Sequence, residues 1–175
     1  ACSTGQEPYS IAMLLDQTPS LAGNSRVEIV ATDISERVLE KARAGLYSQF
    51  EVQRGLPIKF LMSYFRQQGD IWSLSDTIKS KVTFKPLNLL DPLRAIGSFD
   101  VVFCRNVLIY FDMATKRDIL NRLAQQMTDR SYMILGAAET VVGVSDNFTA
   151  TKDHRGLYEK SDGTQRGRPS AFRAA

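Results

Sequence analysis

Residues 99–112 read FDVVFCRNVLIYFD, and this stretch decides the fold that the sequence predicts. Its apolar run at 101–104 is too short for a buried helix and too continuous for a half-exposed strand, which is typical of a central strand in a parallel sheet. Arg105 and Asn106 follow at the carboxyl end of that strand, where open α/β sheets bind ligands. The polar pair is therefore a candidate ligand contact with Tyr110 as its roof, and an ordinary strand-to-helix turn is the alternative.

Composition places the chain among ordinary globular proteins. Its 175 residues are 43% hydrophobic and 23% charged, which suits one domain with its own core. No run approaches the ~20 apolar residues of a membrane span, and the amino terminus lacks the pattern of a signal peptide, so a cytoplasmic protein is expected. With two cysteines and one histidine, neither a disulfide scaffold nor a zinc site is expected.

The net charge of +3 is distributed unevenly along the chain. Residues 1–150 hold 16 basic and 16 acidic side chains, so the whole excess lies after them. A neutral body does not predict a face that binds nucleic acid. The end of the chain, residues 161–175, carries Arg166, Arg168 and Arg173 and is expected to be a flexible basic tail.

The chain opens with ACSTGQEPYS at residues 1–10, a loop of small residues that leads into a helix marked by Ile11, Leu14 and Leu15. After a strand, such a loop brings backbone N–H groups and the start of a helix close to a ligand. It has one glycine where a dinucleotide fingerprint has three, so this pattern by itself is a weak signal.

The next strand is predicted over residues 27–32, VEIVAT, and Asp33 closes it. An acidic residue at the end of the second strand of a nucleotide-binding unit commonly takes the ribose hydroxyls, because one carboxylate can accept from both. Helix capping is the competing role: Asp33 or Ser35 precedes an amphipathic helix expected over residues 36–47. The two roles are compatible.

Residues 49–80 are the least regular part of the chain. A helix that begins near Pro57 and a short strand around residues 71–74 are predicted there as parts of a small appendage. The following strand, over residues 81–88, ends at Asn88. The amide of this asparagine can donate to and accept from a purine edge, and a turn asparagine is the alternative.

The remaining elements complete an alternating pattern. A covering helix is predicted from residue 112 to residue 127, then a strand at residues 132–136, a loop or short strand at 141–148 and a last strand at 156–160. Strands that alternate with amphipathic helices predict an α/β fold, a doubly wound domain with a parallel core. The closing pair of strands is expected to be an antiparallel hairpin.

Four motifs together resemble one family: STGQEPYS, ATDIS, LNLL and FDVVFCRNVLIYFD, which start at residues 3, 31, 87 and 99. They are similar to the catalytic domain of the CheR-type chemotaxis receptor methyltransferases, over about residues 1–160. The resemblance implies a class I S-adenosylmethionine-dependent methyltransferase fold, a Rossmann-like doubly wound sheet, with a small β-subdomain inserted at about residues 47–80. It implies transfer of a methyl group from S-adenosylmethionine to glutamate side chains of bacterial chemoreceptors.

The resemblance also implies roles for single residues on the cofactor. Glu7 would hold the amino group of the methionine moiety, and Asp33 the ribose hydroxyls. Asn88 would bind the adenine together with the backbone of Leu89. S-adenosylhomocysteine would be the product bound in the same place.

At the reacting end, the resemblance places Cys104 and Arg105 along the methionine moiety and Tyr110 beside the transferable methyl group. A glutamate with a pKa near ~4.3 is already a carboxylate at neutral pH, so no general base is required. Catalysis would depend on holding oxygen, methyl and sulfur in line. His154, which lies far from every strand-end motif, is expected at the surface.

The chain differs from the family pattern in two ways. The family's amino-terminal helical domain, its linker with an N-x-T-x-F-F-R motif and the first, central strand of its sheet have no counterpart in residues 1–175. We therefore expect the natural protein to continue upstream, and residues 1–175 alone neither to fold cooperatively nor to methylate. The loop RQQGD at 66–70 has one glycine instead of a glycine run, which disfavours tethering to a receptor tail peptide.

Two other functions stay open at this point. The first is a methyltransferase of the same fold with a different acceptor, since the fold does not fix the acceptor. The second is a non-catalytic domain that binds the cofactor or the receptor as an adaptor. The expected partner is the cytoplasmic domain of transmembrane chemoreceptors, and the expected state is a monomer that neither binds nucleic acid nor inserts into a membrane.

Overall fold

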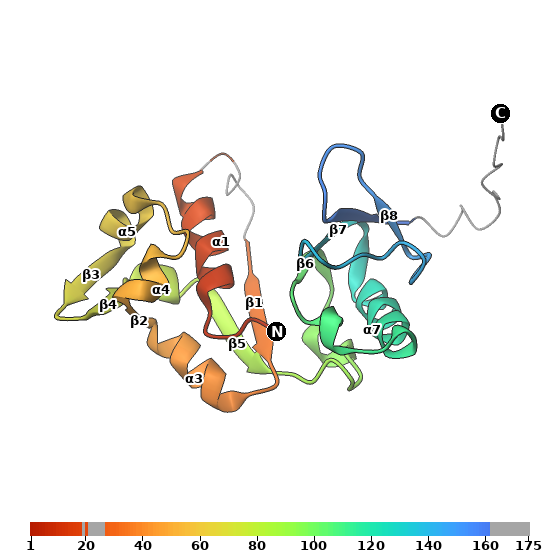
Figure 1. Cartoon of the computed structure of the whole chain (residues 1–175), viewed down its shortest axis with the longest axis horizontal. Coiled ribbons are helices and arrows are strands. Elements are labelled where there is room, and N and C mark those ends of the chain that lie inside the picture. Colours follow the sequence, from red (N-terminus) through yellow and green to blue (C-terminus); the bar gives the residue numbers. More distant parts are fainter. Residues whose placement is uncertain (19, 21–26, 162–175) are drawn as a thin grey trace. The chain divides into compact units, whose positions relative to one another are not determined.

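The structure is a computed structural model that describes residues 1–18, 20 and 27–161 (Figure 1). The chain divides into two compact units, Ala1–Asn88 and Leu89–Ala175. Beyond Ser161, the predicted basic tail lies outside the described residues.

The first unit contains a two-stranded parallel sheet. Strand β1 (Ile29–Asp33) pairs with β5 (Val82–Pro86) in a register that sets Asp33 opposite Pro86. Helices α1 (Gln6–Gln17) and α3 (Glu36–Ala44) contact both strands. Because the two strands run parallel, their carboxyl ends meet at one edge of the sheet. The predicted strands at 27–32 and 81–88 are thus confirmed, with bounds shifted by one or two residues.

Helix α3 shows which of the two candidate caps the sequence uses. The hydroxyl of Ser35 accepts from the Val38 N–H at 3.4 Å, so Ser35 is the N-cap residue and Asp33 is not. The helix ends three residues earlier than predicted, because Gly45 adopts φ 62° and turns the chain out of the helix. The prediction of a helix to residue 47 was wrong for this reason, since the next residues form a strand.

A small antiparallel sheet and three short helices fill the chain between α3 and β5. The strand order is β2-β4-β3, and Pro57 is the N-cap residue of the helix that was predicted to begin near it. The predicted strand around residues 71–74 is also confirmed. The bounds are β2 (Leu46–Ser48), α4 (Gln49–Gln53), α5 (Ile58–Tyr64), β3 (Phe65–Gln68), β4 (Ile71–Leu74) and α6 (Asp76–Lys79). That this segment is an inserted subdomain of about residues 47–80 stays a prediction.

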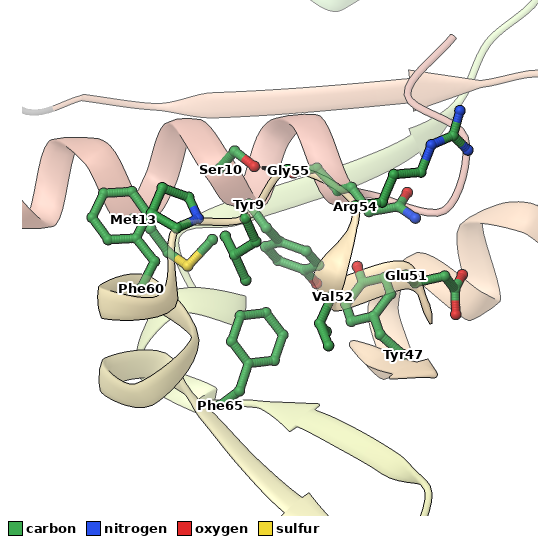
Figure 2. A pocket seen from close by; sticks show the side chains of 13 residues that line it. Tyr9, Ser10, Met13, Tyr47, Glu51, Val52, Arg54, Gly55, Phe60 and Phe65 are labelled. Atoms are coloured by element: carbon green, nitrogen blue, oxygen red, sulfur yellow. Dashed lines mark hydrogen bonds between the residues drawn. The ribbon is translucent and has the colours of Figure 1, made fainter. Parts of the chain in front are cut away.

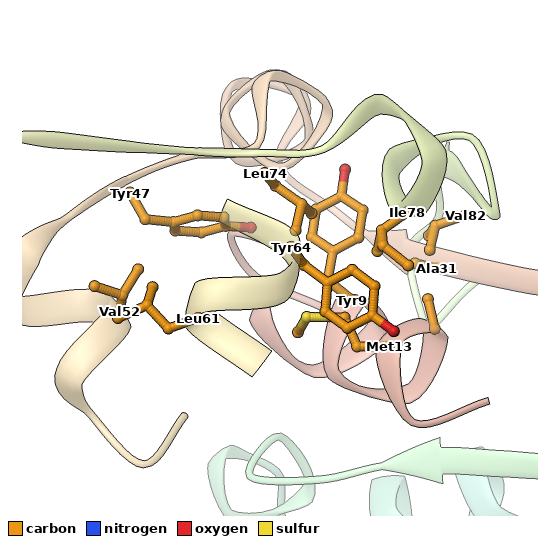
Figure 3. Packing of buried hydrophobic residues seen from close by; sticks show 11 residues of the cluster. Tyr9, Met13, Ala31, Tyr47, Val52, Leu61, Tyr64, Leu74, Ile78 and Val82 are labelled. Atoms are coloured by element: carbon orange, nitrogen blue, oxygen red, sulfur yellow. The ribbon is translucent and has the colours of Figure 1, made fainter. Parts of the chain in front are cut away.

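One hydrophobic cluster joins the small sheet to the parallel pair (Figure 3). Tyr9 and Met13 of α1 are buried in it, 2% and 1% exposed. The Tyr9 ring meets Phe84 of β5 edge to face at 5.6 Å, and its hydroxyl donates to the Ala42 carbonyl at 2.8 Å. From the small sheet and its helices, the cluster includes Tyr47, Val52, Leu61, Tyr64 and Leu74. The appendage therefore shares the core of the first unit.

The second unit contains a four-stranded sheet in the order β6-β7-β9-β8. Strand β6 runs parallel to β7, and β9 runs antiparallel to both β7 and β8, so the closing hairpin is confirmed. The bounds are η1 (Arg94–Ile96), β6 (Phe99–Cys104), η2 (Leu108–Tyr110), α7 (Met113–Gln125), β7 (Met127–Leu135), β8 (Phe148–Ala150) and β9 (Leu157–Lys160), where η marks a 3-10 turn.

Helix α7 covers this sheet with the face that its periodicity predicts. Its N-cap residue is Asp112, whose carboxylate accepts from the Thr115 N–H at 2.9 Å. Ile119 and Leu120 are fully buried, and Leu123 is 6% exposed. Met127, the last residue of the predicted helix, is buried but begins β7 instead.

Strand β6 is less buried than its apolar sequence predicts. Val101 and Phe103 are 46% and 40% exposed, although Cys104 at its end is buried. Within the described residues β6 pairs with β7 alone, so one of its backbone edges has no neighbouring strand there. The prediction of a fully buried central strand is therefore not met within this sheet.

Two surface expectations can also be checked. His154 is exposed, as its position away from the strand ends predicted. Among the helices of residues 1–18 and 27–161, none has the length and apolar character needed to cross a membrane.

Candidate functional site

Two of the predicted residues lie together at the carboxyl edge of β1 and β5. Asp33 ends β1, and its carbonyl accepts from the Leu87 N–H at 2.9 Å. This bond brings Asn88, the next residue, to the same edge. The pairing of parallel strands thus places an acidic side chain and an amide side chain at neighbouring strand ends, where an α/β sheet binds its ligand.

The loop at residues 1–5 folds over the end of β1. The Cys2 N–H donates to the Thr32 carbonyl at 2.8 Å, and the Ser3 N–H donates to Asp33 Oδ2 at 2.9 Å. Gly5 has φ 88°, and a Cβ there would lie 3.0 Å from Ala42 Cβ, so the backbone approaches α3 more closely than a larger residue allows. Helix α1 begins directly after the loop.

Glu7 lies in the first turn of α1, the helix that the loop feeds, and it is half-buried. A carboxylate in the first turn is favoured by the positive end of the helix dipole. Its distance in sequence from Asp33 is large, but the loop at residues 1–5 links the start of α1 to the end of β1. Glu7, Asp33 and Asn88 therefore all belong to the first unit.

Asp33 keeps acceptor capacity for a ligand. Its Oδ2 accepts from Ser3 and its Oδ1 accepts from the Ser35 N–H at 3.1 Å. A carboxylate offers about four acceptor positions, so about two are left by the described residues. The side chain is half-buried, which leaves it accessible. Two vicinal hydroxyls are a ligand group that such a carboxylate suits.

Cys2 lies beside this carboxylate without being a reactive thiolate. Burial raises the pKa of the Cys2 thiol above its ordinary value, and the negative charge of Asp33 acts in the same direction. The amino-terminal charge opposes the shift without reversing it. A neutral thiol at physiological pH fits the expected role of a small packing residue.

The second unit carries the residues predicted for the reacting end on one loop. Cys104 is the buried last residue of β6, and Arg105 follows it on the exposed side of the turn. Asn106 has φ 58°, a left-handed conformation that asparagine tolerates better than most residues. Leu108 is 2% exposed and fixes the turn to the core, whereas Tyr110 is 79% exposed.

Glu139 is a residue of this region that sequence reasoning missed. Its buried carboxylate, on the loop after β7, accepts from the backbone N–H groups of residues 106–109, at 2.7, 3.0, 2.7 and 3.3 Å, and of Gly136 at 2.8 Å. The signal that could have found it is its position: Glu139 comes three residues after the end of the predicted strand at 132–136, whereas Asp33 comes directly after its own predicted strand.

The seven predicted residues are divided between the two units. Each set is coherent within its unit, on strand ends or on the loops that follow them. That the two sets form one site stays a prediction. The first unit contains Glu7, Asp33 and Asn88, and the second contains Leu89, Cys104, Arg105 and Tyr110.

A separate pocket of about 240 Å³ opens in the first unit between α1, α4 and α5 (Figure 2). Tyr9, Tyr47 and Phe60 line its apolar part, while Glu51 and Arg54 lie at its polar part. The two phenol hydroxyls are already engaged, since Tyr9 donates to Ala42 and Tyr47 donates to the Thr4 carbonyl at 2.9 Å. None of the seven predicted residues lines this pocket.

Comparison with known proteins identifies a family that this chain matches. The family model described as CheR methyltransferase, SAM binding domain, matches residues 1–157. A chemotaxis protein methyltransferase of Vibrio parahaemolyticus is 41% identical over 165 residues, which cover 91% of this chain and 59% of that protein. Chemotaxis protein methyltransferase 1 of Pseudomonas aeruginosa is 42% identical over 165 residues, which cover 92% of this chain and 60% of that protein. The chain thus spans about three fifths of the length of these relatives.

Solved structures give weaker similarities. The magnesium protoporphyrin IX methyltransferase from Synechocystis with bound SAM matches with a TM-score of 0.45 and 21% identity, over 91% of this chain and 64% of that chain. A similarity at this level carries no argument about this chain.

Proposed function

The chain belongs to the CheR methyltransferase family, within its SAM-binding domain, and from this premise we propose that it binds S-adenosylmethionine and transfers the methyl group to glutamate side chains of chemoreceptors. The observation that carries the proposal is the family match over residues 1–157. The names of the relatives support the acceptor, since those proteins are chemotaxis protein methyltransferases.

The first unit would contribute Asp33, Asn88 and Glu7 to cofactor binding. Asp33 takes the ribose hydroxyls, a role supported by its position at a strand end and by the acceptor capacity left on its carboxylate. Asn88 and the backbone of Leu89 take the adenine, and Glu7 takes the amino group of the methionine moiety. The donor and acceptor types present at this edge suit these groups.

The second unit would present the reacting end. S-adenosylmethionine, when bound, supplies an electrophilic methyl group on a sulfonium sulfur. Cys104 and Arg105 line the methionine moiety, and the exposed hydroxyl of Tyr110 orients the acceptor carboxylate. Because a glutamate is ionised at neutral pH, these residues have no proton to remove from it, and their contribution is alignment and electrostatic stabilisation.

The acceptor would be the cytoplasmic part of a transmembrane chemoreceptor, so the protein would act in the cytoplasm. We propose that it acts there as a monomer. The neutral charge of residues 1–150 supports a protein acceptor over nucleic acid. The non-catalytic adaptor and the methyltransferase with another acceptor are the functions against which this proposal is tested.

The test is radiolabel transfer from S-adenosylmethionine to a purified receptor by the protein that carries this chain. Alkaline treatment that releases volatile methanol identifies carboxyl methyl esters. Label that is stable to alkali indicates a different acceptor group. Binding of S-adenosylhomocysteine without any label transfer indicates the adaptor.

Tyr110→Phe separates alignment from binding. We expect lower turnover with nearly unchanged affinity for S-adenosylhomocysteine, because a hydroxyl that orients the acceptor acts mainly in the transition state. Tyr132→Phe is the matched control, since Tyr132 is 39% exposed on β7 of the same unit and is no part of the proposed site. Equal losses of turnover and affinity in Tyr110→Phe would assign Tyr110 to support of the cofactor.

A further inference from the structure

We propose that Glu139 is a positioning residue for methyl transfer: its buried carboxylate holds the loop at residues 105–110 in the conformation that presents Arg105 and Tyr110 to the reacting groups. This inference rests on the proposed function and deepens it, because it names what fixes the geometry of the reacting end. Glu139 itself contacts backbone groups of its own chain.

The contacts of Glu139 account for its whole acceptor capacity. Oε1 accepts from Val107, Leu108 and Ile109 at 3.0, 2.7 and 3.3 Å, and Oε2 accepts from Asn106 and Gly136, at 2.7 and 2.8 Å. Five donors exceed the four lone-pair positions of a carboxylate, so two of them share a position. The residue is 8% exposed, which leaves no room for a ligand on these oxygens.

The loop depends on this carboxylate because, apart from the 3-10 turn bonds of Tyr110 and Phe111, its backbone N–H groups from Asn106 to Phe111 have no acceptor in a helix or strand of the described residues. The N–H groups of residues 106–109 come after the last pair of β6 and before α7, and within the described residues their acceptor is Glu139. The left-handed turn at Asn106 aims successive N–H groups into one concavity, as in anion-binding nests. Here the anion is a side chain of the chain itself.

The segment that carries Glu139 has its own contacts with the core and with α7. It is anchored by Val141, which is 1% exposed, and by two side chains of α7. Arg117 Nε donates to the Val144 carbonyl at 3.0 Å, and Asn121 Oδ1 accepts from Asn147 Nδ2 at 2.8 Å. These contacts hold residues 141–147, and the Glu139 N–H donates to the Gly136 carbonyl at 2.9 Å. The backbone that carries the carboxylate therefore has anchors outside the loop, which is what a positioning residue requires.

Gly136 provides the space for this contact. A Cβ at this position would lie 2.7 Å from Glu139 Oε2, closer than real Cβ contacts, and 3.0 Å from the Asn106 nitrogen, which is a tight contact. The strand end, the carboxylate and the loop thus approach one another at a point where a larger residue would displace Glu139 or the loop.

The test compares Glu139→Gln with Glu159→Gln in the protein that carries this chain. Glutamine has nearly the shape of glutamate, but either orientation of its amide turns an NH₂ group toward two or three N–H donors. Glu159 is exposed on β9, so its variant removes the same charge from the same unit without touching the loop. Glu139→Asp keeps the charge on a shorter side chain and serves as the conservative variant.

Three quantities are measured below the melting temperature of each variant: kcat for receptor methylation, affinity for S-adenosylhomocysteine, and hydrogen exchange of the amides of residues 106–109. For Glu139→Gln we expect kcat to fall by about tenfold or more, affinity to fall by a smaller factor because Arg105 also lines the cofactor, and exchange to become faster at these amides. Glu139→Asp should recover part of kcat, and Glu159→Gln should match the wild type.

Unchanged kcat in a folded Glu139→Gln protein would overturn the proposal. So would a loss of exchange protection across the whole protein, since that indicates general unfolding instead of a displaced loop. A wild-type protein that binds S-adenosylhomocysteine but transfers no methyl group would overturn the proposed function, and with it the catalytic part of this inference. Exchange at residues 106–109 would then decide separately whether Glu139 fixes the loop.

Discussion

The two units hold their strand-end loops with different chemistry. In the first unit, two side chains hold the loop at residues 1–5. The half-exposed carboxylate of Asp33 accepts from the Ser3 N–H at 2.9 Å, and the buried phenol of Tyr47 donates to the Thr4 carbonyl at 2.9 Å. In the second unit, a single buried carboxylate, Glu139, accepts from five backbone N–H groups.

The difference teaches how to distinguish a binding carboxylate from a positioning one. Both acids follow strands, so their place in the fold is similar. Asp33 meets two N–H donors of its own chain and keeps acceptor positions for a ligand, whereas those of Glu139 are all taken. We therefore expect a strand-end carboxylate that keeps acceptor positions to bind a ligand, and one whose positions are all taken to hold a loop in place.

The largest effect expected from this difference is on stability. Glu139→Ala leaves five backbone N–H groups without their acceptor. Two of these bonds, from Leu108 and Gly136, are buried and cost ~1–3 kcal/mol each when broken, whereas the other three are part-buried and water can replace the carboxylate there. We expect the free energy of unfolding to fall by ~3–5 kcal/mol, against ~1 kcal/mol or less for Asp33→Ala, whose N–H partners lie where solvent can replace it. Urea denaturation measures both. Similar losses in the two variants would contradict the distinction.

For cofactor binding, we expect the substitution of Asp33 to have a larger effect than the substitution of Glu139. Asp33→Ala should weaken S-adenosylhomocysteine binding by ~1–3 kcal/mol, roughly 5- to 150-fold in the dissociation constant, because a charged acceptor of ligand hydroxyls is lost. Glu139→Gln is the comparison, with a smaller expected change, because it displaces Arg105 without removing a side chain that binds the cofactor. Calorimetry gives both constants. If Asp33→Ala binds S-adenosylhomocysteine as tightly as the wild type, the role of Asp33 is limited to its hydrogen bonds with the backbone N–H groups of Ser3 and Ser35.

Much of the fold could be predicted from local pattern because it depends on neighbours in sequence. The strands at Ile29–Asp33 and Val82–Pro86 and the buried face of α7 follow from apolar runs and helical spacing. The end of α3 was missed because a glycine inside an amphipathic pattern can also be tolerated within a helix. Gly45 instead takes φ 62° and ends it.

The remainder depended on contacts between distant residues. The five donors of Glu139 include a segment about 30 positions earlier in the chain, so no local pattern reveals that they meet it. The exposure of Val101 and Phe103, which lie on the same face of β6, likewise reflects what packs on that face, and not the composition of β6 itself. The sequence predicted the candidate site residues at strand ends. The contacts between the Glu139 carboxylate and the loop at residues 105–110 were found only in the structure.

Gly136→Ala tests whether the packing around Glu139 is as tight as its distances indicate. The added methyl group would overlap Glu139 Oε2 at 2.7 Å, and overpacking of this kind costs ~1–3 kcal/mol. In a Glu139→Ala background the same substitution should cost less, because the oxygen it displaces is gone. A double-mutant cycle by urea denaturation should give a coupling of at least about 0.5 kcal/mol. Additive effects would mean that the methyl group is accommodated elsewhere.

The smallest expected effect is at alkaline pH, and it concerns the phenols of the first unit. Burial raises the pKa of Tyr9 to about 12 and also raises the pKa of Tyr47. A pKa that is higher in the folded than in the unfolded state gives stability that is complete below the unfolded value near 10 and is lost as the pH rises through the folded value. For Tyr9 alone, the loss by about pH 11 is on the order of 1 kcal/mol.

Trp72, the single tryptophan of these 175 residues, lies on β4 of the first unit, so its fluorescence during urea denaturation reports on that unit. Between about pH 9 and pH 11, the wild type should lose ~1 kcal/mol more than Tyr9→Phe, which has no proton to release. Tyr9→Phe also loses the bond to the Ala42 carbonyl, which lowers stability at both pH values and therefore cancels from the difference. If the two proteins lost the same free energy over this range, the titrating group would be another one, and the phenol of Tyr9 would hold its unit together without making it sensitive to alkali.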